Sequence, residues 1–198
     1  TNEYGIREEQ INKFNGFKED IYIAEYKPDP LFPEKLPFNN FITIRPENLK
    51  ASYIRSGSRS IVPELFNVLK DENILFLPRY AEERKFSKGY SNIFIPEEPL
   101  NGLDVCYYSK SVLTGAGTFA REAALLGTPA VSFFPGSKTL TVDKILREEG
   151  KQFFSRNTEE IYHFVKTSEK RTEPRKRSEF VLNEVLSIID NIMGKYSV

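Results

Sequence analysis

The sequence predicts an α/β domain built on a doubly wound parallel sheet. Short runs of consecutive apolar residues alternate along the chain with segments of helical spacing. Such runs are typical of parallel strands that helices cover on both faces, and right-handed crossovers then give the doubly wound layout. The turn Gly115-Ala116-Gly117 joins one apolar run to one helical segment, as expected where a ligand binds at the end of a strand.

The N-terminal part of the chain is less regular. Residues 1–20 are polar and form an approach segment, and residues 21–26 are expected to form a strand. The prolines between positions 27 and 37 exclude a regular helix or a central strand there.

From residue 41 onward the pattern becomes regular. The predicted strands are 41–45, 74–77, 92–95, 111–114 and 130–134. The predicted helices are 60–70, 103–108, 118–126, 141–149, one that begins at the capping signature Asn157-Thr158-Glu159-Glu160, and a last one at about 177–193. Gly127 and Gly150 are expected to follow helix ends.

The composition argues against several classes of protein. Lys plus Arg and Asp plus Glu both number 28 in 198 residues, and this zero net charge argues against a nucleic-acid-binding protein. One cysteine, Cys106, excludes an internal disulfide and fits the cytoplasm. The single histidine, His163, is expected on an exposed helix, which leaves a zinc site or a Ser-His-Asp triad without support. We expect no metal, no cofactor and no membrane span.

The glycine turn carries the clearest chemical signal. Gly115 and Gly117 let the backbone bend sharply and approach a ligand without an intervening Cβ atom. The N–H groups of Gly117, Thr118 and Phe119 would open a helix, where the positive end of the helix dipole favours a diphosphate. The pattern is neither Gly-x-Gly-x-x-Gly, since Ala120 replaces the third glycine, nor a P-loop.

Three charged residues are expected near that turn. Glu122 lies one helical turn beyond it and is placed to accept hydrogen bonds from a ribose diol; the alternative is a salt bridge with Arg121 or Lys138. Arg45 and Arg79 end other predicted strands, so parallel strands would bring them to the same rim, where a guanidinium neutralises a phosphate. The alternative for both arginines is a solvated position at a strand end.

The run at 92–95 is expected to end at the same rim and to contact a base through its backbone and Phe94. The alternative for Phe94 is a place in the core. Glu97 and Glu98 follow this run, and adjacency in a loop does not make them an acid and base pair. The sequence assigns no catalytic residue.

Five motifs of the chain have the form of a family signature: Thr114-Gly-Ala-Gly-Thr-Phe-Ala-Arg-Glu-Ala-Ala-Leu-Leu-Gly-Thr-Pro129, Lys27-Pro-Asp-Pro30, Arg45-Pro46-Glu47, Ala51-Ser52-Tyr53 and Leu77-Pro-Arg-Tyr80. They resemble the motifs of an uncharacterised family, domain of unknown function 354, and the resemblance covers about residues 14–165. That family is similar to the UDP-N-acetylglucosamine 2-epimerases and the GT-B glycosyltransferases, whose C-terminal domain binds the nucleotide-sugar.

The resemblance implies roles for individual positions. Ala116, Gly117 and Thr118 would hold the diphosphate, Glu122 the ribose, and Ile95 with its neighbours the base. The run Arg45-Pro46-Glu47-Asn48 resembles the epimerase His-Arg-Arg-Glu-Asn segment without its histidine. Pro78-Arg79-Tyr80 falls where epimerases have another histidine, so the chain lacks groups that 2-epimerisation needs.

The resemblance also implies a domain organisation. Residues 1–40 would be an approach segment left from a missing N-terminal domain, residues 41–166 a Rossmann-like nucleotide-sugar-binding domain, the C-terminal half of a GT-B-type protein, and residues 167–198 a linker with the C-terminal helix. The apolar stripe of that helix, Val181, Val185, Ile188, Ile189 and Ile192, belongs either to the core or to a surface that docks on a partner.

The leading hypothesis is a UDP-sugar-like nucleotide-sugar-binding domain of a glycosyltransferase-like protein. Its expected ligand is a nucleotide-sugar or a nucleoside diphosphate, and activity would need the missing N-terminal domain or a partner chain. The alternatives are a non-catalytic nucleotide-binding or interaction module and one half of a two-chain enzyme. A sugar-nucleotide 2-epimerase is the hypothesis that the sequence supports least.

Overall fold

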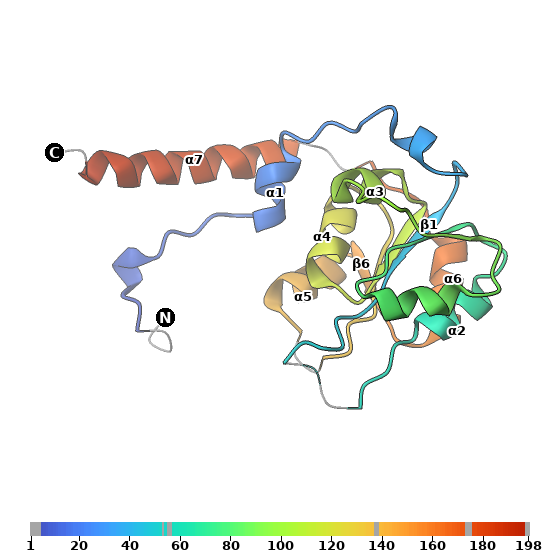
Figure 1. Cartoon of the computed structure of the whole chain (residues 1–198). Coiled ribbons are helices and arrows are strands. Elements are labelled where there is room, and N and C mark those ends of the chain that lie inside the picture. Colours follow the sequence, from blue (N-terminus) through green and yellow to red (C-terminus); the bar gives the residue numbers. More distant parts are fainter. Residues whose placement is uncertain (1–4, 53, 55–56, 137–138, 173–175, 197–198) are drawn as a thin grey trace. The chain divides into compact units, whose positions relative to one another are not determined.

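The computed structural model describes residues 5–52, 54, 57–136, 139–172 and 176–196. The chain divides into two compact units, one of residues 27–173 and one of residues 1–26 with 174–198 (Figure 1). The larger unit holds the sheet and every predicted site residue.

Six parallel strands form the sheet of the larger unit, in the order β3-β2-β1-β4-β5-β6. The strands are β1 (Ile42–Arg45), β2 (Ile74–Phe76), β3 (Ile93–Phe94), β4 (Ser111–Thr114), β5 (Ala130–Ser132) and β6 (Gln152–Phe154). The predicted fold class, a doubly wound parallel α/β sheet, is confirmed. Strands β1 to β5 lie within the five predicted apolar runs.

Helices cover both faces of this sheet (Figure 1). On one side α2 (Val62–Val68) packs against α6 (Thr158–Thr167), and on the other α4 (Gly117–Leu125) packs against both α3 (Gly102–Tyr108) and α5 (Thr141–Glu148). Two 3-10 helices, η3 (Phe32–Lys35) and η4 (Ala81–Ser87), complete the unit. Each helix predicted for this unit is present within a few residues of its expected bounds, and Asn157 caps α6 as predicted.

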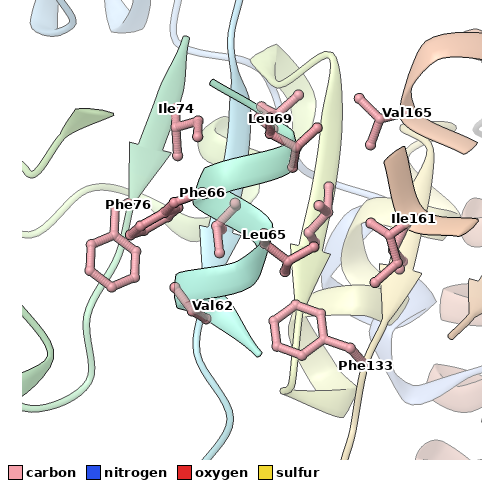
Figure 2. Close-up of a cluster of buried hydrophobic side chains, with 13 residues drawn as sticks. Val62, Leu65, Phe66, Leu69, Ile74, Phe76, Phe133, Ile161 and Val165 are labelled. Atoms are coloured by element: carbon pink, nitrogen blue, oxygen red, sulfur yellow. The ribbon is translucent and has the colours of Figure 1, made fainter. Parts of the chain in front are cut away.

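The hydrophobic core lies between the sheet, α2 and α6, as Figure 2 shows. Leu65 of α2, Leu69 at its C-cap, and Ile161 and Val165 of α6 are all fully buried. Phe66, also fully buried, points instead toward Phe76 of β2, with the two ring centres 5.0 Å apart. The apolar residues whose spacing predicts α2 from the sequence therefore lie on the face that α2 buries.

The sequence missed β6, the edge strand next to β5. Its three residues, Gln152-Phe153-Phe154, do not form a continuous apolar run, because one face of an edge strand is less covered. Phe154 remains 39% exposed, so the strand lacks the signal that identified its neighbours.

The smaller unit contains η2 (Glu8–Gln10), α1 (Lys18–Ile23) and α7 (Lys176–Tyr196). The prediction of a strand at 21–26 is wrong, because residues 21–23 belong to α1. The Asp20 carboxylate accepts a hydrogen bond from the Phe17 amide at 2.9 Å at the start of α1, and from the Ser178 hydroxyl of α7 at 2.7 Å. These bonds favour a helix packed on α7 over an unpaired strand.

The apolar stripe of α7 behaves differently along its length. Val181 is fully buried, and a Cβ atom on Gly16 would lie 2.3 Å from its side chain. Ile189 and Ile192 are 48% and 37% exposed. The first turns therefore contribute to packing, while the later turns expose their apolar side chains. No helix in the described part of the chain is long and apolar enough to cross a bilayer.

The strand order also fixes where a ligand site is expected. From β1 the chain continues to β2 on one side, whereas β4, the other neighbour of β1, continues to β5 on the opposite side. Connections that diverge in this way leave a crevice at the carboxyl ends of the two strands, which is where open α/β sheets bind ligands. Here the strand order reverses between β1, which ends at Arg45, and β4, which ends at Thr114.

Replacing Leu65 with Ala tests the core. The substitution removes a fully buried side chain from α2, and we expect it to lower the free energy of unfolding by about 2–5 kcal/mol in urea titrations. Leu140→Ala is the matched control, because Leu140 is 57% exposed and should change stability by less than about 0.5 kcal/mol. Equal effects of the two substitutions would contradict this core.

Candidate functional site

The carboxyl ends of β1 and β4 lie side by side. Arg45, the last residue of β1, pairs in register with Thr114, the last residue of β4, and the Gly115 amide donates a hydrogen bond to the Arg45 carbonyl at 3.1 Å. The glycine turn and Arg45 therefore occupy the same rim of the sheet, as the prediction requires.

Gly115 allows the segment after β1 to approach the glycine turn closely. A Cβ atom at this position would lie 2.5 Å from both the Cα and the Cγ atom of Glu47, which is shorter than real side chains tolerate. The backbone torsions at Gly115 are ordinary, since its φ angle is not positive. The glycine is thus required sterically, because the segment after β1 presses against the turn.

Glu47 is the buried anchor of this rim. Its side chain has no exposed surface and accepts hydrogen bonds from Arg156 Nη1 at 2.9 Å, the Ser60 hydroxyl at 2.6 Å and the Ile61 amide at 3.3 Å. A buried carboxylate is stable only when it is paired and hydrogen-bonded in this way. Glu47 therefore ties the end of β1 to the segment that leads into α2.

Arg156 completes the anchor from the far side of the sheet. It follows β6, and besides binding Glu47 it donates hydrogen bonds to the carbonyls of Phe133 and Arg59. Arg156 was not predicted as a site residue, because the strand that precedes it, β6, was not predicted either. The signal that identified Arg45 and Arg79 was an arginine at the end of a predicted strand. Arg156, two residues beyond β6, has the same signal once β6 is known.

The first turn of α4 presents free backbone amides at this rim. The Ala116 amide donates to Thr114 Oγ1 at 2.9 Å, and the Ala116 carbonyl accepts a helical bond from the Ala120 amide at 3.2 Å. The amides of residues 117–119 precede that donor, so they have no partner within the helix. Ala116 is the N-cap residue and no side chain caps the helix. The turn can therefore bind an anion through its amides.

Arg121 adds a buried positive charge beside the same turn. Its guanidinium donates to Thr118 Oγ1 at 3.2 Å and forms an ion pair with Asp143 of α5 at 3.1 Å. A Cβ atom on Gly117 would lie 2.9 Å from Arg121 Nη1. From the sequence, Arg121 was predicted only as a possible salt-bridge partner of Glu122. The other partner considered, Lys138, lies outside the described residues, as does Tyr53 of the family motif.

A cavity of about 300 Å³ opens at the carboxyl ends of β1, β2 and β3. Its volume is at the lower end of the range of small-molecule sites. The lining residues are Arg45, Leu77, Pro78, Arg84, Ile95, Pro96, Glu97, Glu98, Pro99, Leu100, Gly102, Val105 and Phe119. Of the predicted site residues, Arg45 and Ile95 line this cavity, whereas Arg79, Gly115, Ala116, Gly117, Thr118 and Glu122 do not.

Arg45 lines the cavity and leaves one donor of its guanidinium without a partner in the described structure. Its Cζ atom lies 5.4 Å from the centre of the Phe119 ring, a favourable cation–π distance. Its Nε atom is buried and has no hydrogen-bond acceptor within the described residues. Leaving a buried donor unpaired is costly, so an acceptor on a ligand would stabilise this side chain.

Arg79 follows β2 and contacts the segment directly after Arg45, but it does not line the cavity. Its Nε atom donates to the Pro46 carbonyl at 2.9 Å, and its amide donates to the Glu83 carboxylate at 2.7 Å. It therefore joins the segment after β1 to η4 instead of facing the cavity.

Glu122 is half-buried on α4. Burial raises the pKa of the Cys106 thiol well above its usual value; the Glu122 charge raises it further, and Arg45 lowers it. Glu122 and Arg45 therefore both lie within electrostatic range of Cys106 on α3, the helix whose Gly102 and Val105 line the cavity. The thiol stays protonated at neutral pH and does not act as a nucleophile.

His163 is exposed on α6, as predicted. No three His, Cys, Asp or Glu side chains in the described part of the chain gather to hold a metal ion. The chemistry of the rim is therefore that of arginines, carboxylates and backbone amides.

The chain belongs to the family described as "Protein of unknown function (DUF354)", whose profile matches residues 2–196. An uncharacterized protein of Methanocaldococcus jannaschii is 31% identical over 113 residues, which are 56% of this chain and 33% of that protein. The resemblance inferred from the motifs is thereby confirmed.

The fold is similar to that of UDP-GlcNAc 2-epimerases. The enzyme from Methanocaldococcus jannaschii gives a TM-score of 0.64 at 18% identity, over 96% of this chain and 58% of that one. A structure of the Methanocaldococcus jannaschii enzyme in complex with UDP-GlcNAc and UDP gives a TM-score of 0.63 at 16% sequence identity. The match covers 96% of this chain and 57% of that one. A protein from Listeria monocytogenes described as a putative UDP-N-acetylglucosamine 2-epimerase gives a TM-score of 0.55 at 12% identity, over 89% of this chain and 52% of that one. The chain thus spans little more than half of these epimerases, and likeness at such identity shows the fold alone.

Replacing Gly115 with Ala tests the close approach at the rim. The new Cβ atom would overlap Glu47, whose backbone cannot move without breaking the contacts to Arg156 and Ser60. We expect a loss of about 1–3 kcal/mol in the free energy of unfolding, measured by denaturant titration. Gly102→Ala is the control, because its nearest neighbour would be Phe119 at an ordinary 3.7 Å. If Gly115→Ala is as stable as Gly102→Ala, the steric account is wrong.

Proposed function

We propose that this chain is the nucleotide-sugar-binding domain of a glycosyltransferase-like protein, and that it holds its ligand at the carboxyl ends of β1 and β4. The observation that carries the proposal is Arg45. It lines the cavity, its buried Nε donor has no acceptor within the described residues, and it ends β1 at the same rim as the free amides of the α4 turn.

The diphosphate is the part of the ligand that this rim suits best. The amides of Gly117 and Thr118 and the positive end of α4 favour an anion. Arg45 adds a full positive charge from the neighbouring strand, and a guanidinium binds phosphate oxygens with directed hydrogen bonds. In a transfer reaction the same groups would stabilise the charge on the leaving diphosphate.

The nucleoside then extends along the cavity. Ile95 and Phe119 supply apolar surface for the base. In this proposal the carboxylate of Glu122, which lies on α4 and outside the lining of the cavity, accepts the hydrogen bonds of the ribose diol. The likeness in fold to an epimerase whose structure contains UDP-GlcNAc and UDP supports this ligand class.

Transfer of the sugar is proposed only for this chain together with a second domain or a partner chain. The residues at the rim hold a donor, and none is assigned as a general base. Epimerisation is not proposed, because the run Arg45-Pro46-Glu47-Asn48 lacks the histidine of the corresponding epimerase segment.

Arg45→Gln tests the phosphate role. By isothermal titration calorimetry with UDP and UDP-GlcNAc, we expect the natural chain to bind both and Arg45→Gln to bind about tenfold more weakly, since a charge-assisted hydrogen bond is lost. Arg59→Gln is the matched control, because Arg59 is exposed and does not line the cavity. The absence of binding of any nucleoside diphosphate to the natural chain would refute the proposed function.

Glu122→Ala tests the ribose role separately. We expect this substitution to weaken UDP-sugar binding with little loss of thermal stability, and to abolish the preference for UDP over 2′-deoxy-UDP, because the carboxylate accepts hydrogen bonds from the diol. Glu64→Ala, on the exposed side of α2, serves as control. An unchanged affinity in calorimetry would remove Glu122 from the site.

A further inference from the structure

The cavity that contains Arg45 also contains a second arginine. Arg84 lies on η4, the 3-10 helix that follows β2, and its side chain lines the same cavity. It is exposed, and within the described residues its side chain forms no hydrogen bond or ion pair. Its positive charge therefore faces the cavity without a partner in the described structure.

Arg79, the second arginine expected from the sequence, does not take this place. Its Nε atom is bonded to the Pro46 carbonyl, and it is not among the residues that line the cavity. Arg79 joins the segment after β1 to η4 through hydrogen bonds. Arg84, five residues further along the chain, contributes its charge to the lining of the cavity.

The charges of the cavity are separated along the sheet. Arg45 ends β1 and Arg84 follows β2, whereas Glu97 and Glu98 follow β3, the edge strand. The two positive charges therefore belong to the segments after β1 and β2, and the two negative charges to the segment that leads from β3 to α3. A ligand that matches this order carries its anionic group toward β1 and β2 and its hydroxyl or N–H donors toward β3.

We propose that Arg84 is a second anion-binding residue and that, with Arg45, it makes the site selective for a diphosphate over a monophosphate. This inference rests on the proposed function. A nucleoside monophosphate satisfies Arg45 and the α4 amides, whereas the additional phosphate of a diphosphate gives Arg84 a partner. No local sequence pattern singles out Arg84, because it lies inside a 3-10 helix and not at a strand end.

The test compares Arg84→Gln with Lys85→Gln by calorimetry, using UDP, UMP and inorganic pyrophosphate at low and physiological ionic strength. Both substitutions remove one positive charge from adjacent positions of η4, and only Arg84 lines the cavity. We expect Arg84→Gln to bind UDP and pyrophosphate about fivefold more weakly, because its charge is exposed and screened, and to bind UMP unchanged. Lys85→Gln should match the natural chain, and both variants should keep its melting temperature.

The possible results separate the two proposals. If the natural chain binds UDP and Arg84→Gln keeps the same ratio of UDP to UMP affinity as Lys85→Gln, Arg84 has no such role and the proposed function still stands. If the natural chain binds neither UDP nor pyrophosphate, the proposed function fails and the role of Arg84 fails with it. A reduced ratio in Arg84→Gln alone supports the inference.

Discussion

The rim of the sheet depends on one buried carboxylate, that of Glu47. A charge with no exposed surface is tolerated because Arg156, Ser60 and the Ile61 amide all bind it. These contacts join the end of β1 to the start of α2 and to the segment after β6, three parts of the chain that are distant in sequence. They also explain why residue 115 is a glycine, since the backbone of Glu47 occupies the space that a side chain there would need.

That anchor determines the geometry on which ligand binding would rely. With the segment after β1 held against the glycine turn, Arg45 and the first amides of α4 face the same rim before any ligand arrives. Binding groups that are fixed in advance lose little conformational freedom when a ligand binds. The arginines divide into two kinds accordingly: Arg79 and Arg156 hold backbone carbonyls and so build the rim, whereas Arg45 and Arg84 keep their charge in the cavity.

Much of the fold and part of the site followed from the sequence. Continuous apolar runs identified β1 to β5, because central parallel strands are buried on both faces, and the glycine turn and Arg45 were located from their places at strand ends. The same reasoning failed where burial was partial, at β6, and where the smaller unit stabilises a helix through Asp20 and α7. Glu47, Arg156 and Arg84 gain their meaning from contacts or cavities formed by distant segments, and no local spacing encodes these. The roles of Arg79 and Arg45 differ for the same reason, although their sequence contexts look alike.

The setting of Cys106 has a practical consequence. It is the single cysteine of the chain, it is fully buried on α3, and its thiol resists ionisation. A maleimide reagent would therefore react with a cysteine engineered on the surface and leave the native one untouched. Fluorophores or spin labels can thus be attached to a pair of engineered cysteines, one on each unit, without first deleting a native residue, and the distance between the two labels can be measured in solution.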